Sequence, residues 1–174
     1  MGRFGDCDLR SSGSGLPPSS RHSWHRPQGA NHLNPGMSIA VGSPVELVSG
    51  VYLIVPVTIT CPDPMLGPTQ FLQSESVSVS VTQRFGQSLA AGSGNLSYRD
   101  DSRFGGGIIG SPLACDGTPH TYSINVFPSV LGTPFKGGRA VATASFNILV
   151  QDTSTFRGDS SSSSSGPTSV RIRG

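Results

Sequence analysis

Asp116, His120 and Ser123 lie close together in the sequence and have the residue types of a hydrolytic triad. In such a triad a carboxylate orients a histidine, which takes the proton of a serine nucleophile. Three-dimensional geometry defines a triad, so spacing along the chain carries little information. Asp116-Gly117 is more typical of a tight turn in which the Asp side chain bonds to nearby backbone. We therefore predict no catalytic residue, and a hydrolase using His120 is the least favoured of three functions.

Cys61 and Cys115 each adjoin a run of residues typical of a β-strand. Residues 55–61 end at the first cysteine, and residues 115–126 begin at the second. We predict a disulfide between the two cysteines. Closing the loop of chain between Cys61 and Cys115 would stabilise a folded domain by about 4 kcal/mol in the chain-entropy model. The alternative is two reduced, buried thiols that behave as small hydrophobic side chains.

Strand direction sets a condition on this bond. If Cys61 and Cys115 both end strands, and successive strands reverse direction, an odd number of strands must separate them. We therefore expect residues 87–114 to act as one interrupted strand, with residues 95–106 as a bulge or loop. Two full strands in this stretch would contradict the expectation unless a crossover intervenes.

Two groups of residues have the types of metal ligands. His22, His25 and His32 lie in a segment without supporting cysteine or carboxylate ligands, so we predict no metal there. Asp100 and Asp101 have the oxygen ligands that calcium prefers, but neighbouring arginines make a solvated loop the favoured interpretation.

A glycine-rich segment at residues 105–110 formally matches the G-x-G-x-x-G pattern of dinucleotide-binding proteins. That fingerprint requires a helix directly after it and a βαβ unit around it. Here Ser111-Pro112 follows within a strand-like pattern, so we interpret the segment as a loop. We predict no cofactor.

Composition limits the size of the fold and its partners. The chain has 174 residues, of which 13% are charged, and a formal net charge of +2. One domain is expected at this length. The charge is too small to steer nucleic acid to one face, so no nucleic-acid partner is predicted. No apolar run is long enough to cross a bilayer, so no membrane span is predicted.

Composition also divides the chain into three segments. Residues 1–36 show no strand or helix period, and we predict disorder. Residues 37–156 alternate repeatedly between apolar and polar residues, and we predict that they form the domain. Residues 157–174 are rich in serine, and we predict a flexible tail. Residues 169–173 alternate again, so the less favoured alternative is a strand added to a sheet edge.

The domain is predicted to be all-β. Strong alternation marks strands within residues 51–61, 77–81, 122–126 and 140–150. Weaker candidates are residues 38–41, 45–48, 87–91 and 107–114. About seven strands separated by turn residues suit a two-sheet Greek-key β-sandwich.

Four segments together resemble small exported bacterial Ig-like domains of unassigned function. They are residues 57–61 (VTITC), 77–84 (VSVSVTQR), 115–121 (CDGTPHT) and 135–140 (FKGGRA), and the resemblance covers roughly residues 40–150. The most specific piece is Cys115 followed by Asp-Gly-Thr-Pro-His. The resemblance implies an Ig-like sandwich and an extracellular or cell-surface location, with no activity attached. No signal peptide is visible in this chain.

These observations favour a non-enzymatic, extracytoplasmic binding or structural module with a Cys61–Cys115 disulfide. Its partner, which the sequence does not identify, would be a cell-surface or extracellular protein or a glycan. The alternative is a virion or surface-appendage subunit that assembles through its tails.

Overall fold

The computed structural model describes residues 36–64, 66–129 and 133–174. This part of the chain is all-β, as predicted, and contains ten strands and one 3-10 turn. The sequence-based predictions for the N-terminal segment, including its three histidines, lie outside the described residues.

One layer of strands is built around β3 (Tyr52–Thr60). On one side of β3, β1 (Ser38–Val41) pairs with the C-terminal half of β3, and β2 (Val45–Val48) pairs with the N-terminal half of β3. On the other side, β7 (Pro119–Pro128) pairs with β3 along almost its full length. All of these pairings are antiparallel.

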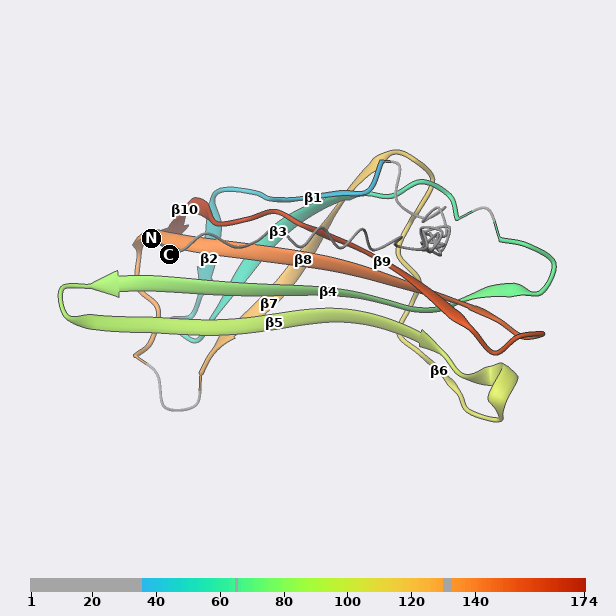
Figure 1. The fold of residues 1–174 in the computed structure, drawn as a ribbon. Coiled ribbons are helices and arrows are strands. Elements are labelled where there is room, and N and C mark those ends of the chain that lie inside the picture. The colour runs from blue at the N-terminus through green and yellow to red at the C-terminus, as the bar shows by residue number, and fades with distance from the viewer. Residues whose placement is uncertain (1–35, 65, 130–132) are drawn as a thin grey trace, which may run out of the picture. The chain divides into compact units, whose positions relative to one another are not determined.

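The other layer is built around β4 (Gln70–Phe85), which lies between β5 (Ser88–Asp100) and β8 (Gly138–Asp152). The last two strands both pair with β8: β9 (Gly158–Ser164) with its C-terminal half and β10 (Thr168–Arg173) with its N-terminal half. In Figure 1, β4, β5 and β8 run side by side, and β3 and β7 run diagonally to them.

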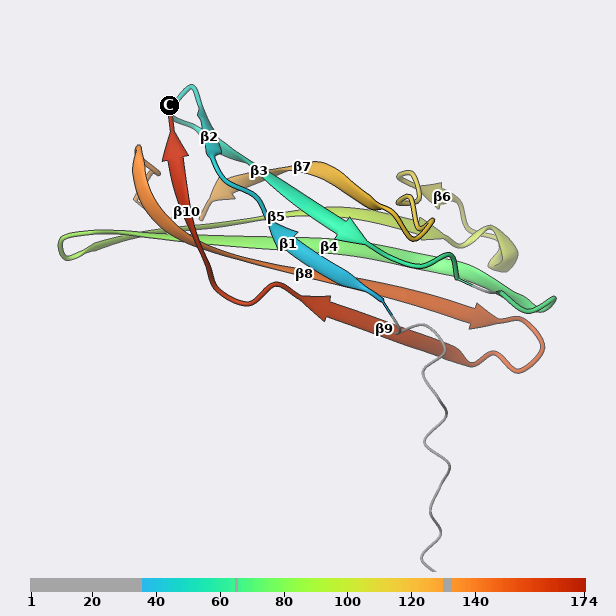
Figure 2. The same cartoon turned by 90° about the horizontal axis from the view of Figure 1, so that it is seen from above.

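Two short pairings join the layers. β10 pairs with β2 in parallel, and β5 pairs with β7 antiparallel, so all ten strands belong to one mixed sheet. The β5–β7 crossing requires glycine, because a Cβ atom at Gly94 would collide with the carbonyl oxygen of Asn125. Figure 2 shows the parallel neighbours β10 and β2 near the C-terminus.

Alternation along the strands fills the space between the layers. Side chains in a strand point to opposite faces in turn, so every second residue reaches the core. The central strands bury Leu53, Val55, Val57 and Ile59 from β3, Val77, Val79 and Val81 from β4, Ile124 and Val126 from β7, and Ala142, Ala144, Phe146 and Ile148 from β8. Two polar residues share the core face of β4: Glu75 is 1% exposed and Gln83 is 2% exposed.

The prediction of a flexible tail at residues 157–174 is wrong. Residues 158–164 form β9 and residues 168–173 form β10, so the folded unit extends well past residue 156. Val170 and Ile172 are buried, which explains the alternation that the sequence shows there. Serine composition resembles that of a linker, but backbone pairing with β8 supplies the hydrogen bonds that order this segment.

The number and lengths of the strands also differ from the prediction of about seven. β5 continues without interruption to Asp100, so the expected loop at residues 95–106 is confined to the stretch after it. That stretch contains the 3-10 turn η1 (Ser102–Phe104) and the two-residue strand β6 (Ile108–Ile109), which pairs with the end of β5. Pairing with β4 extends β5, because the partner strand offers hydrogen bonds irrespective of side-chain pattern.

Candidate functional site around the disulfide

The predicted disulfide between Cys61 and Cys115 is present, with a Cα–Cα distance of 4.8 Å. Cys61 follows β3 directly, and Cys115 shortly precedes β7. Because β3 and β7 are antiparallel and Thr60 lies opposite Pro119, the end of one strand meets the start of the other. Cys61 is completely buried, whereas Cys115 is only partly buried.

The premise that both cysteines end strands is wrong. Cys115 lies before its strand, so the requirement for an odd number of intervening strands does not apply. The antiparallel pairing of β3 with β7 brings the cysteines together directly. Strand order along the chain could not reveal this pairing, because the layers are assembled from strands far apart in sequence.

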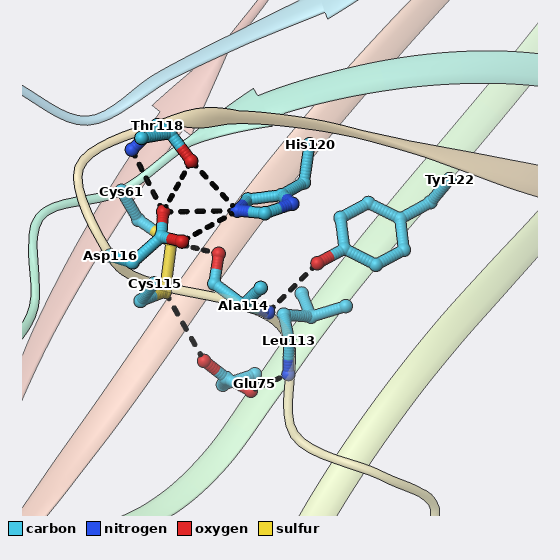
Figure 3. The surroundings of a disulfide bond; sticks show 9 residues. All are labelled: Cys61, Glu75, Leu113, Ala114, Cys115, Asp116, Thr118, His120 and Tyr122. Atoms are coloured by element: carbon cyan, nitrogen blue, oxygen red, sulfur yellow. Dashed lines mark hydrogen bonds and ion pairs between the residues drawn. A yellow bond between two sulfur atoms is a disulfide. The ribbon is translucent and has the colours of Figure 1, made fainter.

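Glu75 lies beside the disulfide on β4, as Figure 3 shows. Its Oε2 accepts a hydrogen bond of 2.6 Å from the backbone N–H of Leu113. Its Oε1 lies 3.6 Å from the Sγ atom of Cys115. A disulfide sulfur carries no proton, so this is a contact in the oxidised protein and becomes a hydrogen bond only with a thiol. Burial raises the pKa of Glu75 above its ordinary value of 4.5, and the Leu113 N–H opposes that rise.

Further hydrogen bonds fix the 110–118 segment, which carries Cys115 between β6 and β7. The backbone N–H of Ala114 donates to the hydroxyl oxygen of Tyr122 at 2.8 Å. The backbone N–H of Gly117 donates to the carbonyl oxygen of Cys61 at 2.9 Å. The segment is therefore held from β4, from β7 and from the end of β3.

Asp116, Thr118 and His120 form an exposed cluster on the outer side of the disulfide (Figure 3). Oδ1 of Asp116 accepts hydrogen bonds from the backbone N–H of Thr118 at 2.8 Å and from its hydroxyl at 2.6 Å. The Nε2 atom of His120 lies 2.9 Å from the same oxygen. The hydrogen bonds from Thr118, and then that from His120, hold the pKa of Asp116 well below its ordinary value of 3.8. This is the predicted Asp116-Gly117 turn, with Gly117 at a φ of +82°.

The cluster lacks the arrangement of a hydrolytic triad. A triad uses one ring nitrogen of histidine for the carboxylate and the other for the nucleophile. Here the same nitrogen of His120 faces both Asp116 and the hydroxyl of Thr118, which lies 3.0 Å away. Ser123 is an odd number of residues from His120 on β7, so it points to the opposite face of the strand. The structure brings Asp116 and His120 together and leaves Ser123 apart.

The remaining sequence motifs do not converge on this site. The glycine-rich segment at residues 105–110 forms the turn before β6 and the strand itself, with no helix after it. The two aspartates that precede it are engaged locally: Arg99 pairs with Asp101 at 2.6 Å, and Asp100 accepts a bond from the N–H of Ser102. Across the described ranges, no group of three or more His, Cys, Asp or Glu side chains could hold a metal.

A second feature, which we call the serine face, covers the outer side of β5, β4, β8 and β9. Strand register places its members in adjoining rows across the four strands. They are Ser76, Ser78 and Ser80 of β4, Ser93, Asn95 and Ser97 of β5, Thr143, Ser145 and Asn147 of β8, and Ser162 and Ser164 of β9. Each presents a hydroxyl or an amide, and none is charged. Some hydroxyls bond across strands, such as Ser80 with Thr143 at 2.6 Å.

Sequence reasoning missed both Glu75 and the serine face. Glu75 is in phase with Val77 and Val79, so the strand period already placed its side chain on the core face. The alternating serines of β4 were visible as the polar side of a strand. Which strands would extend that polar side into a wide face depended on pairing, which no local pattern specifies.

The part of the chain that the structure describes has no helix long and apolar enough to span a membrane. Comparison with protein-family models, curated proteins and solved structures finds no match to this chain. Its function is therefore inferred from its own residues and their geometry.

Proposed function

We propose that this protein is a non-enzymatic, extracytoplasmic binding or structural module of the bacterial Ig-like class. The disulfide is the observation that carries the proposal. Disulfides persist in oxidising compartments such as the periplasm and the cell exterior, and they are rare in the reducing cytosol. The bond of this chain closes the end of the core beside a buried strand, as expected for a structural crosslink.

The arrangement of strands supports an Ig-like Greek-key sandwich. Two groups of mainly antiparallel strands bury alternating side chains against each other, which is the core pattern of such domains. One feature departs from antibody domains, where the conserved disulfide joins the two sheets. Here it joins the neighbouring strands β3 and β7 of one layer.

The serine face favours a glycan as partner over a protein. Protein interfaces are enriched in aromatic residues and arginine at their centres. The serine face has neither, and its uncharged hydroxyls and amides match the neutral hydroxyl groups of a polysaccharide. Strands about 4.8 Å apart repeat these groups across the surface, so one chain of sugars could bond to several strands.

Intact mass measurement tests the location and the crosslink. Protein recovered from the native host and its medium is alkylated without reduction, and Cys61 and Cys115 are examined for the label. An extracellular species with both cysteines unlabelled supports the proposal. A purely intracellular species with both cysteines labelled contradicts it.

Co-sedimentation with insoluble cellulose and chitin tests the partner class. We expect the wild-type protein to pellet with at least one of these polymers, and Ser78→Glu to pellet less because it adds a charge to the centre of the serine face. Ser123→Glu, on the exposed side of β7 in the other layer, is the matched control and should pellet like wild type. Equal binding by the two variants, or no binding by wild type, would overturn the glycan assignment.

The other two functions lack a favouring observation. A subunit that assembles through both tails would need a free C-terminal segment, but β9 and β10 are paired within the sheet. A hydrolase using His120 would need a nucleophile within reach of its second ring nitrogen, and Ser123 faces away from it.

A further inference from the structure

The core face of β4 carries two buried polar side chains with different surroundings. Gln83 uses both ends of its amide: Nε2 donates to the carbonyl oxygen of Lys136 at 2.8 Å, and Oε1 accepts from the N–H of Lys136 at 3.0 Å. Glu75 uses one oxygen for the N–H of Leu113, and its other oxygen faces the sulfur of Cys115. The oxygen of a side-chain amide at position 75 would accept the hydrogen bond from the backbone N–H of Leu113 equally well. The presence of an ionisable group there calls for a role that an amide cannot fill.

Proton transfer with Cys115 is such a role. The thiolate is the reactive form of cysteine in disulfide exchange, and an ordinary thiol has a pKa of about 8.5. A base that takes the thiol proton must lie within hydrogen-bonding reach. Oε1 of Glu75 meets this condition at 3.6 Å from the sulfur atom.

We propose that Glu75 is the proton acceptor for closure of the Cys61–Cys115 disulfide when the reduced chain is oxidised. The co-reactant is a low-molecular-weight disulfide. Cys115 is the cysteine that reacts with this co-reactant, because it is partly exposed and Cys61 is completely buried. The proposal concerns closure of the bond and holds whatever the module binds.

The reaction has two exchange steps. Glu75 takes the proton of Cys115, whose thiolate attacks the external disulfide; a mixed disulfide forms and one external thiolate leaves. Cys61 then attacks the sulfur of Cys115, and the second external thiolate leaves with the proton of Cys61. The proton held by Glu75 passes to the first thiolate. Two protein thiols are oxidised, one external disulfide is reduced to two thiols, and Glu75 is regenerated.

The surroundings of Glu75 favour this role. Its partner on β8 is the apolar Ile148, and its partner on β5 is Tyr98. The described residues form two ion pairs, Arg99 with Asp101 and His120 with Asp116. Neither pair involves Glu75, so no cation lowers the pKa of its carboxyl group. Burial raises its pKa towards that of a thiol, which makes it a stronger base.

Other titratable groups near the bond are already engaged. Tyr122 on β7 accepts the N–H of Ala114, and Asp116 is bonded to Thr118 and His120. The pKa of Tyr98 is raised, first by burial and then by Asp100 and Glu75, so its hydroxyl stays protonated at neutral pH. Glu75 is therefore the group placed to accept the proton of Cys115.

Oxidation kinetics test the proposal. Full-length protein is reduced, mixed with oxidised glutathione between pH 5.5 and 9, and quenched with an alkylating reagent at intervals. Glu75→Gln should slow closure by about 100-fold near pH 6, at the low end of what a general base supplies. The rates of the two proteins should converge above about pH 8.5, where thiolate forms without a base. A ratio of rates that does not change with pH would show a merely structural role and overturn the proposal.

A second measurement needs no disulfide closure. In a Cys61→Ser background, the alkylation rate of Cys115 is followed against pH. With Glu75 present, Cys115 should stay reactive at a lower pH than Cys115 in the Cys61→Ser/Glu75→Gln double variant. Identical pH profiles for Cys115 in the two proteins would also overturn the proposal. Gln83→Glu, which places a carboxyl on the same face of β4 but eight residues away from position 75, should leave the profile unchanged.

Discussion

Glu75 and Gln83 occupy the same face of the same strand, and each holds a connecting segment against the core. Gln83 bonds to Lys136 just before β8, and Glu75 bonds to Leu113 ahead of β7. The neutral amide satisfies both backbone groups of one residue. The acid satisfies one backbone group and leaves an oxygen beside a sulfur atom. The comparison shows that this fold can hold a loop without an ionisable side chain, so the acid at position 75 needs a separate reason.

The largest effect is expected from removal of the crosslink beside Glu75. Cys61→Ser should lower the free energy of unfolding by about 2–5 kcal/mol, because the unfolded chain regains the entropy that the closed loop denies it. Denaturant titration with and without reductant measures this change. Wild type and variant should differ strongly without reductant and far less with it. An equal difference under both conditions would mean that the serine disturbs packing and that the bond contributes little.

The next largest effect is expected at Gln83, the neutral residue of the pair. Gln83→Ala removes both hydrogen bonds to Lys136 and should cost about 2 kcal/mol, since a buried group left unpaired loses its solvation. Glu75→Gln keeps an acceptor for the Leu113 N–H and should cost less. Urea titration of both variants at pH 7 compares them. A greater loss for Glu75→Gln would contradict the view that an amide can hold the Leu113 segment.

A smaller effect, the dependence of stability on pH, is expected at Glu75 and not at Gln83. Because the folded-state pKa of Glu75 is raised above 4.5, the folded protein binds its proton more tightly than the unfolded chain does. The stability linked to Glu75 is therefore complete below about pH 4.5 and is lost as pH rises through the folded-state pKa. The Glu75→Gln variant has no carboxyl to ionise and so escapes this loss. Its free energy of unfolding, compared with that of wild type, should therefore improve from pH 4.5 to pH 8. A difference that is constant over this range would refute the linkage.

The smallest effect has the opposite sign and comes from the exposed turn outside the disulfide. The pKa of Asp116 is depressed, so the stability linked to it is present above pH 3.8 and is lost as pH falls towards the folded-state value. Asp116→Asn should slightly lower the melting temperature at pH 5 and have little effect near pH 2. Thermal unfolding followed by circular dichroism at the two pH values measures this change. If Asp116→Asn lowered the melting temperature near pH 2 and not at pH 5, the hydrogen-bonded turn would not be the source of the effect.

Local patterns predicted the parts of the structure that local interactions decide. Alternation placed the central strands, because the side chains of an extended chain repeat every two residues whatever their partners. The Asp116-Gly117 turn was also predictable, since the aspartate bonds to a backbone group only two residues away. The disulfide was predictable from two cysteines beside strands, although the reasoning from strand direction assigned Cys115 to the wrong end of its strand.

The tertiary structure alone decided which segments meet. Serine-rich residues 158–164 became β9 because β8 offered a free edge, and backbone hydrogen bonds along that edge do not depend on side-chain type. The position of Glu75 on the core face follows from strand period, but its neighbours Leu113 and Cys115 come from a segment far along the chain. Local sequence patterns specified the central strands, a turn and two cysteines beside strands. Long-range pairing determined the ten-stranded sheet, the serine face and the acid beside the disulfide, because those contacts join residues that no local pattern connects.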